Sequence, residues 1–182
     1  MTQEEVRNEI TRLVNNNLSY RKAQNMIAWL DGIGFFEAPA SSKYHGAYPG
    51  GLADHSLSVA LNLRDLTSKM KLKWIGGRRS PIMVGILHDV CKVDQYEPVD
   101  GSGYVYKTDS IFSHHAEKSI AMILSSGCIS MNEEEVACIR WHMGAYEKDA
   151  NEWKYLNNAI HKYPNVFWTH VADMEASHLQ GV

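Results

Sequence analysis

The stretch Pro81-Ile82-Met83-Val84-Gly85-Ile86-Leu87-His88-Asp89 joins an unbroken apolar run to an imidazole and a carboxylate. A histidine beside an aspartate means little by itself. The pair at the end of this run becomes informative because residues of the same two kinds form a series with it along the chain.

Residues of the same two kinds recur on both sides of this stretch. In chain order the candidate ligands are His55, His88, Asp89, His115, His142 and Asp173. Imidazole nitrogens and carboxylate oxygens bind divalent cations well, and one carboxylate can bridge two ions with one oxygen on each. Mixed nitrogen and oxygen ligands favour manganese, iron, cobalt, nickel or zinc over magnesium, which prefers oxygen. The pattern indicates a site for one or two divalent metal ions inside a helical core.

Length and composition indicate one compact soluble unit. The chain has 182 residues, of which 45% are hydrophobic and 21% charged, and its net charge of −3 gives no sign of broad attraction to nucleic acid or acidic membranes. Three cysteines without CxxC spacing argue against a disulfide framework or a cysteine zinc site. The N-terminus lacks the apolar stretch of a signal peptide, and no run approaches the ~20 apolar residues of a membrane span. We expect a cytoplasmic protein that does not bind membranes.

Helical spacing of the apolar residues predicts an all-α fold. The predicted helices cover about residues 6–14, 20–30, 51–70, 81–89, 113–125, 130–144, 152–161 and 165–179. Ser80 is the predicted N-cap of the fourth helix, with Pro81 at its first position. Ser130 and Glu133 form the predicted capping box of the sixth.

One segment departs from the helical pattern. Residues 96–106, with Asp100-Gly101-Ser102-Gly103 at their centre, are typical of a small β-hairpin, which we expect to close over a pocket. On the third predicted helix His55 shares a face with apolar residues and should point inward. Residues 1–40 are expected to form N-terminal helices that pack on a main domain of residues 41–182.

Beyond the ligands themselves, several segments resemble the HD superfamily of metal-dependent phosphohydrolases. The pattern of this superfamily is H…HD…D, with two further histidines in its two-metal members. The matching segments are Gly50-Gly51-Leu52-Ala53-Asp54-His55, Gly85-Ile86-Leu87-His88-Asp89-Val90-Cys91-Lys92, His115-Ala116-Glu117-Lys118-Ser119, Arg140-Trp141-His142-Met143-Gly144 and His170-Val171-Ala172-Asp173. The resemblance covers about residues 40–180. It is nearest to single-domain HD proteins related to the HD domain of 3′–5′ exoribonucleases, which the segment 44–51 before the first ligand also resembles. It implies the all-helical HD fold with a small β-hairpin insertion after the HD helix.

The resemblance also implies a function. A hydroxide activated by metal would cleave a phosphoester bond of a nucleotide or related small phosphate ester, with Asp89 as the central ligand and Lys92 in contact with the phosphate. His45, Tyr48 and Arg140 are further candidates for binding substrate. Packing within the irregular segment 35–50 explains His45 and Tyr48 as well as substrate binding does. A solvated helix face explains Arg140 equally well.

Three alternatives stay open at this point. The first is a phosphodiesterase or 3′–5′ exonuclease acting on cyclic nucleotides or short RNA, although the chain has no room for the additional oligonucleotide-binding domain of that branch. The second is a non-catalytic module that binds a nucleotide through a metal. The third is an iron-dependent oxygenase, because diiron relatives of that type exist. Relatives in the superfamily often form dimers, so a homodimer is one expected assembly.

Two more histidines lie next to the proposed ligands. His115 fits the superfamily pattern better than His114, because a small residue, Ser119, follows it four positions later. His170 precedes Asp173 by about one helical turn, so it is expected either to pack the last helix or to support the ligands from outside.

Overall fold

The computed structural model describes residues 1–99, 103–144 and 152–182. Within them the chain is all-α with one small hairpin, which confirms the predicted fold class. The helices are α1 (Gln3–Asn17), α2 (Tyr20–Gly32), α3 (Gly51–Lys69), α4 (Arg79–Leu87), α5 (His115–Ser126), α6 (Glu133–Arg140), α7 (Trp153–Lys162) and α8 (Asn165–Met174). The 3₁₀ turn η1 (Val90–Asp94) follows α4, and the π-helical turn η3 (Glu175–Gln180) continues α8. Strands β1 (Tyr96–Pro98) and β2 (Tyr104–Tyr106) form the hairpin.

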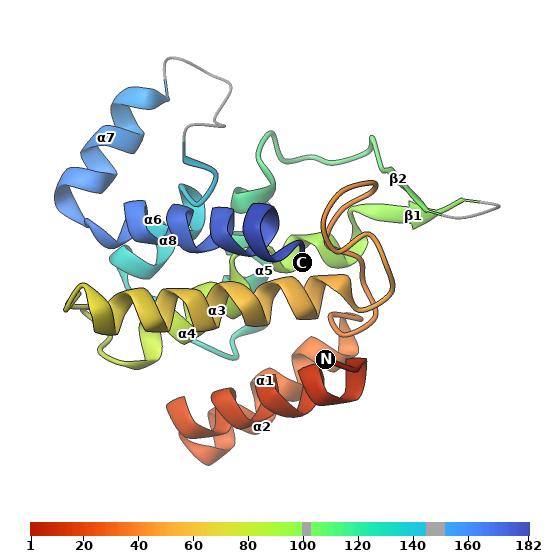
Figure 1. The fold of residues 1–182 in the computed structure, drawn as a ribbon, viewed down its shortest axis with the longest axis horizontal. Helices are drawn as coiled ribbons and strands as arrows, with labels where there is room; N and C mark the ends of the chain where they lie inside the picture. The colour runs from red at the N-terminus through yellow and green to blue at the C-terminus, as the bar shows by residue number, and fades with distance from the viewer. Residues whose placement is uncertain (100–102, 145–151) are drawn as a thin grey trace.

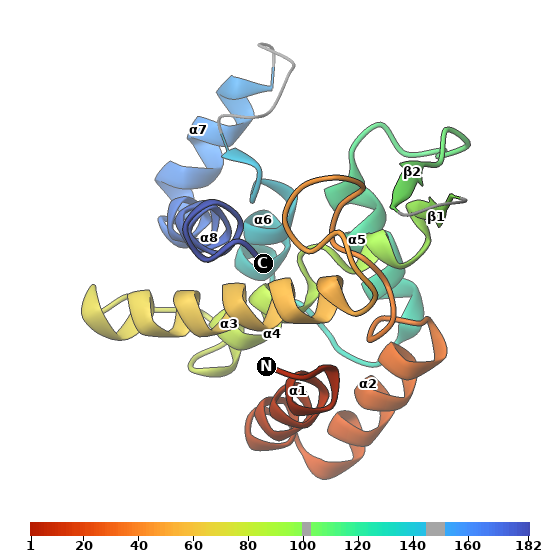
Figure 2. The same cartoon turned by 45° about the vertical axis from the view of Figure 1, so that its right-hand side comes forward.

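Helix α3 lies at the centre of the arrangement. It contacts α1, α4 and α8. Figure 1 shows α1 and α2 on one side of α3 and α8 on the other, and Figure 2 keeps this separation after the view is turned. The turns η1 and η3 also contact α3. The segments that follow α4 and α8 are therefore brought to the same central helix.

The apolar run of the opening stretch forms α4, and it is buried along its whole length. Its closest neighbour is α3, at the point where Gly85 faces Ala60. A Cβ placed on Gly85 would lie only 2.3 Å from the Ala60 Cα, so the two helix backbones pack too closely for a side chain at this position. This close approach fixes the end of α4, and with it His88 and Asp89, against α3.

The N-terminal helices share the core of the rest of the chain. On α1 the residues Val6, Ile10, Leu13 and Val14 are buried, and they belong to one hydrophobic cluster with residues of α3, α4 and α8. Their spacing follows the helical period that the sequence showed. The division into residues 1–40 and 41–182 stays a prediction.

The predicted N-cap at Ser80 is wrong. Helix α4 begins at Arg79, and Ser80 lies inside its first turn. The Ser80 hydroxyl instead donates a hydrogen bond to the buried Glu135 carboxylate at 2.7 Å. Pro81 is tolerated there because the first turn of a helix has no internal acceptor for its backbone N–H groups.

The predicted capping box at Ser130 and Glu133 is also wrong, by two residues. Asn132 is the N-cap of α6: its side chain accepts from the Glu135 N–H at 3.0 Å, and the Glu135 carboxylate accepts from the Asn132 N–H at 2.9 Å. Asparagine caps helices as well as serine does. Glu135 is then held further by Ser80 and Arg79, which contacts that carboxylate at 3.1 Å.

The hairpin follows the helix that leads to His88 and Asp89, as predicted, with η1 between them. Tyr96 pairs with Tyr106 and Pro98 with Tyr104 in antiparallel register. Residues 100–102, the predicted centre of the turn, lie outside the described residues. None of the helices that the structure describes combines the length and apolar character needed to cross a bilayer.

Replacing Gly85 with alanine is expected to lower the free energy of unfolding by about 1–3 kcal/mol, because the added methyl group forces α3 and α4 apart. Chemical denaturation followed by circular dichroism measures this. Gly32→Ala is the matched control, since a Cβ at the end of α2 meets nothing within 4 Å. Equal unfolding midpoints for the two variants would contradict the close packing of α3 on α4.

Candidate metal centre

The six candidate ligands come from five separate parts of the chain, and most stand at helix ends. His88 is the C-cap of α4 and Asp89 the residue that leads into η1. His115 is the first residue of α5, His142 lies just beyond α6, and Asp173 lies near the end of α8. His55 is in the second turn of α3, on its buried side. The fold brings all six into one cluster.

One half of the cluster surrounds the Oδ2 atom of Asp89. His88 Nε2 lies 3.3 Å from this oxygen and 3.3 Å from His55 Nε2. Asp173 Oδ1 lies 3.2 Å from the same His55 nitrogen. His55, His88 and Asp173 each offer one ligand atom, and these three atoms lie within 4.8 Å of one another. Asp89, His88, His55 and Asp173 form the first ligand group.

The other half surrounds the second oxygen of the same carboxylate. Asp89 Oδ1 lies 3.4 Å from His115 Nε2 and 3.5 Å from His142 Nε2. The two imidazole nitrogens are 3.1 Å apart. These three residues form the second ligand group. Asp89 belongs to both groups and presents one oxygen to each.

Backbone carbonyls fix the orientation of three of the imidazoles. His88 Nδ1 lies 2.8 Å from the Gly85 carbonyl oxygen, and His142 Nδ1 lies 2.7 Å from that of Ile139. His55 Nδ1 lies 3.0 Å from the Val182 carbonyl oxygen. A carbonyl only accepts hydrogen bonds, so in each case the Nδ1–H must donate. The neutral ring then carries its lone pair on Nε2, which points at the carboxylates and is ready to bind a cation.

The Asp89 carboxylate tests whether a metal fits this cluster. Asp89 is 2% exposed, and its Oδ1 accepts no well-formed hydrogen bond from any residue that the structure describes. The neutral His142 ring directs its Nε2 lone pair toward this oxygen across 3.5 Å. A cation placed between a buried anion and such a lone pair would satisfy both. The cluster therefore could bind a metal.

The charges inside the cluster depend on one another. Burial opposes ionisation of Asp89, but Lys92 and His88 lower the pKa of its carboxyl well below the usual range. Burial lowers the pKa of His88 and of His115. Burial also opposes charge on His142, yet Asp89 raises the pKa of this ring above its ordinary value. A proton on His142 and a metal ion are thus alternative ways of satisfying the same carboxylate.

A cleft of about 260 Å³ opens onto the cluster. Lys92 lines it and holds its ammonium group 2.6 Å from Asp89 Oδ2. His45 lines it as well, with its ring centre 5.0 Å from that of His55. Burial lowers the pKa of His45 to about 4, so this imidazole is neutral at physiological pH. Both residues line the cleft, and their substrate-binding role stays a prediction.

Tyr48 and Arg140, the other two predicted substrate-binding residues, are not among the described residues that line this cleft. The Tyr48 hydroxyl donates to the Asp54 carboxylate at 2.7 Å. The Arg140 guanidinium pairs with Glu152 at 2.6 Å and stacks on Trp141. Each has partners that account for its position without a substrate.

The two histidines that the sequence left open lie beside the ligand groups. His114 Nε2 lies 3.4 Å from Glu152 Oε1, outside both groups. His170 Nδ1 lies 2.8 Å from the His142 carbonyl oxygen, so its N–H donates to the backbone of a ligand. Its ring also fills the space over Gly144, where a Cβ would lie 2.6 Å from it. His170 therefore supports the segment that carries His142.

Tyr96 from β1, and Ser177 and His178 from η3, also line the cleft. Tyr96 belongs to the hairpin that was expected to close over a pocket, although this residue was not singled out. Ser177 and His178 were not predicted at the cleft. Both residues reach the cleft from a π-helical turn. The apolar residues of this segment show no pattern from which the wider spacing of that turn could be predicted.

Comparison with known proteins gives one partial match. A curated protein of Methanocaldococcus jannaschii, named dihydroneopterin 2′,3′-cyclic phosphate phosphodiesterase, is 35% identical over 88 residues. The match covers 46% of this chain and 31% of that protein, so the aligned part is about a third of the relative's length. No family model matches the chain. No solved structure matches it either.

Adding manganese to protein treated with chelator is expected to raise the melting temperature, because an ion that binds only the folded state stabilises it by about 2.7 kcal/mol at a hundredfold excess over Kd. Calorimetric titration should give up to two ions per chain. Asp89→Asn should remove most of the binding, since this residue belongs to both ligand groups. His161→Ala, an exposed histidine of α7, should bind as the wild type does. Unchanged binding by Asp89→Asn would place the metal elsewhere.

Proposed function

We propose that this protein is a metal-dependent phosphohydrolase of the HD superfamily that hydrolyses a small phosphate ester. The observation that carries the proposal is the buried Asp89 carboxylate, whose two oxygens face two different groups of imidazoles. This is the arrangement that a carboxylate bridging two ions requires. The partial likeness to a protein named as a phosphodiesterase supports the same class of reaction.

His55, His88, Asp89 and Asp173 would hold one ion, and Asp89, His115 and His142 the other. The mixture of imidazole and carboxylate donors suits manganese, iron, cobalt, nickel or zinc better than magnesium. Ions bound there would supply a water of lowered pKa as the nucleophile and would offset negative charge on the phosphoryl oxygens.

Lys92 and His45 are the side chains that we assign to the phosphate. The Lys92 ammonium contacts Asp89 Oδ2, the same oxygen that faces His88, so a cation bound by this oxygen would compete with it. Released toward the cleft, the ammonium would pair with a phosphate oxygen. His45, neutral at physiological pH, would donate one ring N–H to a second oxygen.

The size of the cleft favours a small substrate. About 260 Å³ is enough for a phosphate with its attached sugar or polyol. Because the relative is named for a 2′,3′-cyclic phosphate, a cyclic phosphodiester is the first substrate to test. In that reaction water forms a new bond to phosphorus, one ring P–O bond breaks, the leaving oxygen takes up a proton, and the product is a phosphomonoester. Acyclic nucleotides come next.

The decisive experiment is a product-resolved screen with manganese. Cyclic phosphodiesters, nucleoside monophosphates and deoxynucleoside triphosphates should be compared with short RNA. We expect turnover of small esters, and we expect Asp89→Asn to lower the activity by more than about 100-fold. Mutating residues that only hydrogen-bond to metal ligands already costs roughly 10–100-fold in metal affinity or activity. Full activity in that variant would assign the hydrolysis to a contaminant. Turnover of RNA alone would favour the exonuclease. Oxygen uptake with ferrous iron, without hydrolysis, would indicate an oxygenase.

Lys92→Met is expected to lower kcat/KM by about 100-fold while the number of bound ions stays the same, because it removes a charged group aimed at the phosphate and no metal ligand. Steady-state kinetics together with metal analysis separates the two effects. Lys162→Met is the matched control, since Lys162 pairs with Glu133 on the surface of α7. If Lys92→Met lost metal and kept its kcat/KM per bound ion, Lys92 would be a structural residue.

A further inference from the structure

A second cavity lies beside the cleft, and we propose that it is a subsite for the organic group of the substrate. The ligand that it fits is a neutral, planar heterocycle that carries hydrogen-bond donors and acceptors, such as a nucleobase or a pterin. This inference rests on the phosphohydrolase function proposed above and specifies its substrate.

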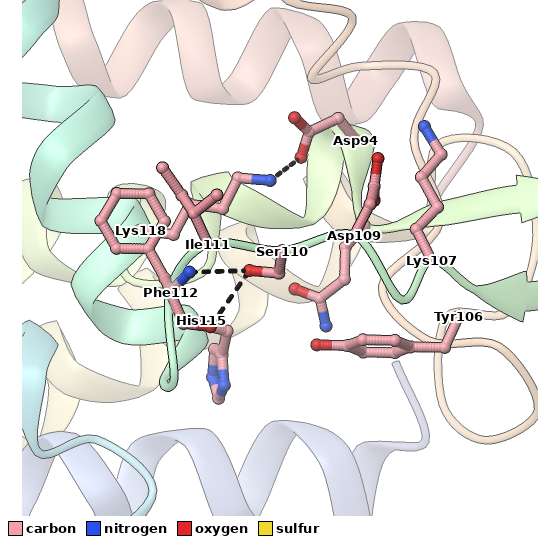
Figure 3. Close-up of a pocket in the computed structure, with 10 residues that line it drawn as sticks. Asp94, Tyr106, Lys107, Asp109, Ser110, Ile111, Phe112, His115 and Lys118 are labelled. Carbon is pink, nitrogen blue, oxygen red and sulfur yellow. Dashed lines mark hydrogen bonds and ion pairs between the residues drawn. The ribbon is translucent and has the colours of Figure 1, made fainter.

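The cavity has a volume of about 290 Å³ and lies between η1, strand β2 with the segment after it, and α5 (Figure 3). His115 and Gln95 line both this cavity and the cleft over the cluster. Figure 3 shows the rings of Tyr106 and His115 extending to the same side of the cavity. A substrate whose phosphate lies in the cleft would therefore reach the second cavity by extending its organic group past His115.

The pairing of the two strands places one tyrosine at the cleft and one at the second cavity. Tyr96 and Tyr106 are paired across the strands, and their rings meet edge to face with centres 5.7 Å apart. Tyr96 lines the cleft, whereas Tyr106 lines the second cavity and stays 53% exposed. An accessible aromatic ring at a cavity wall binds planar heterocycles by stacking.

The charges of the cavity argue against a second phosphate as its occupant. Its lining contains two lysines, Lys107 and Lys118, and two aspartates, Asp94 and Asp109. Lys118 is already bound to Asp94. With cations and anions in equal number, the lining offers no excess positive charge to a triphosphate tail or a polynucleotide backbone. Lys107 and Asp109 instead offer a donor and an acceptor to the edge of a polar ring.

The test compares two esters that share the reacting group. One is a nucleoside cyclic phosphate, and the other is glycerol cyclic phosphate, which lacks the heterocycle. Wild-type protein with manganese should prefer the nucleoside ester, and Tyr106→Ala should reduce the ratio of the two kcat/KM values by about tenfold. Tyr106→Phe keeps the ring and should keep the ratio. Val105→Ala is the control for the hairpin, because neighbouring strand residues face opposite sides and Val105 does not line the cavity.

An unchanged ratio in Tyr106→Ala would overturn the subsite, whether the activity on both esters is kept or falls by the same factor. If the wild type hydrolyses neither ester, the cyclic phosphodiesterase reaction fails, and binding of the free nucleoside decides the subsite separately. Saturation-transfer NMR should then show binding to the wild type that Tyr106→Ala lacks. No binding to the wild type would reject the subsite as well.

Discussion

The Asp89 carboxylate is a buried negative charge, and the rest of the structure depends on how the neighbouring groups compensate it. Water cannot solvate it, so the surrounding groups must, and each of them is held by a different element. Lys92 compensates one oxygen directly, while imidazoles surround both oxygens. The close packing of α3 on α4 at Gly85 keeps this carboxylate in place. Displacing any one element would leave a buried anion with fewer partners, so helix positions and ligand positions depend on each other.

Helix ends are well suited to building such a cluster. The last carbonyls of a helix have no partner within it, and here they accept the Nδ1–H groups of His88 and His142. One hydrogen bond thus satisfies a free carbonyl and sets the tautomer of a ligand. Because the two rings stand just beyond α4 and α6, they can turn toward a common point that residues along a single helix face could not reach.

Much of this arrangement was predictable from the sequence, for identifiable reasons. Apolar spacing predicted the helices, and the order of histidines and aspartates indicated residues that the structure brings into one cluster; their metal-binding role stays a prediction. Helix starts were less predictable, since several residues could cap and the choice depends on tertiary partners such as Glu135. Arg140 is close to His142 in sequence, yet it extends to Glu152. His178 reaches the cleft only through the wider π-helical turn.

The contact between Lys92 and Asp89 has a consequence for how the protein matures. An anion already neutralised by a resident ammonium does not require an ion in order to be buried. If the cluster binds metal as proposed, the chain would complete its folding first and acquire its ions afterwards, unlike small zinc domains, in which metal capture and folding are one event. The metals bound would then depend on which metals the surroundings supply, and exchange of one metal for another would leave the fold intact.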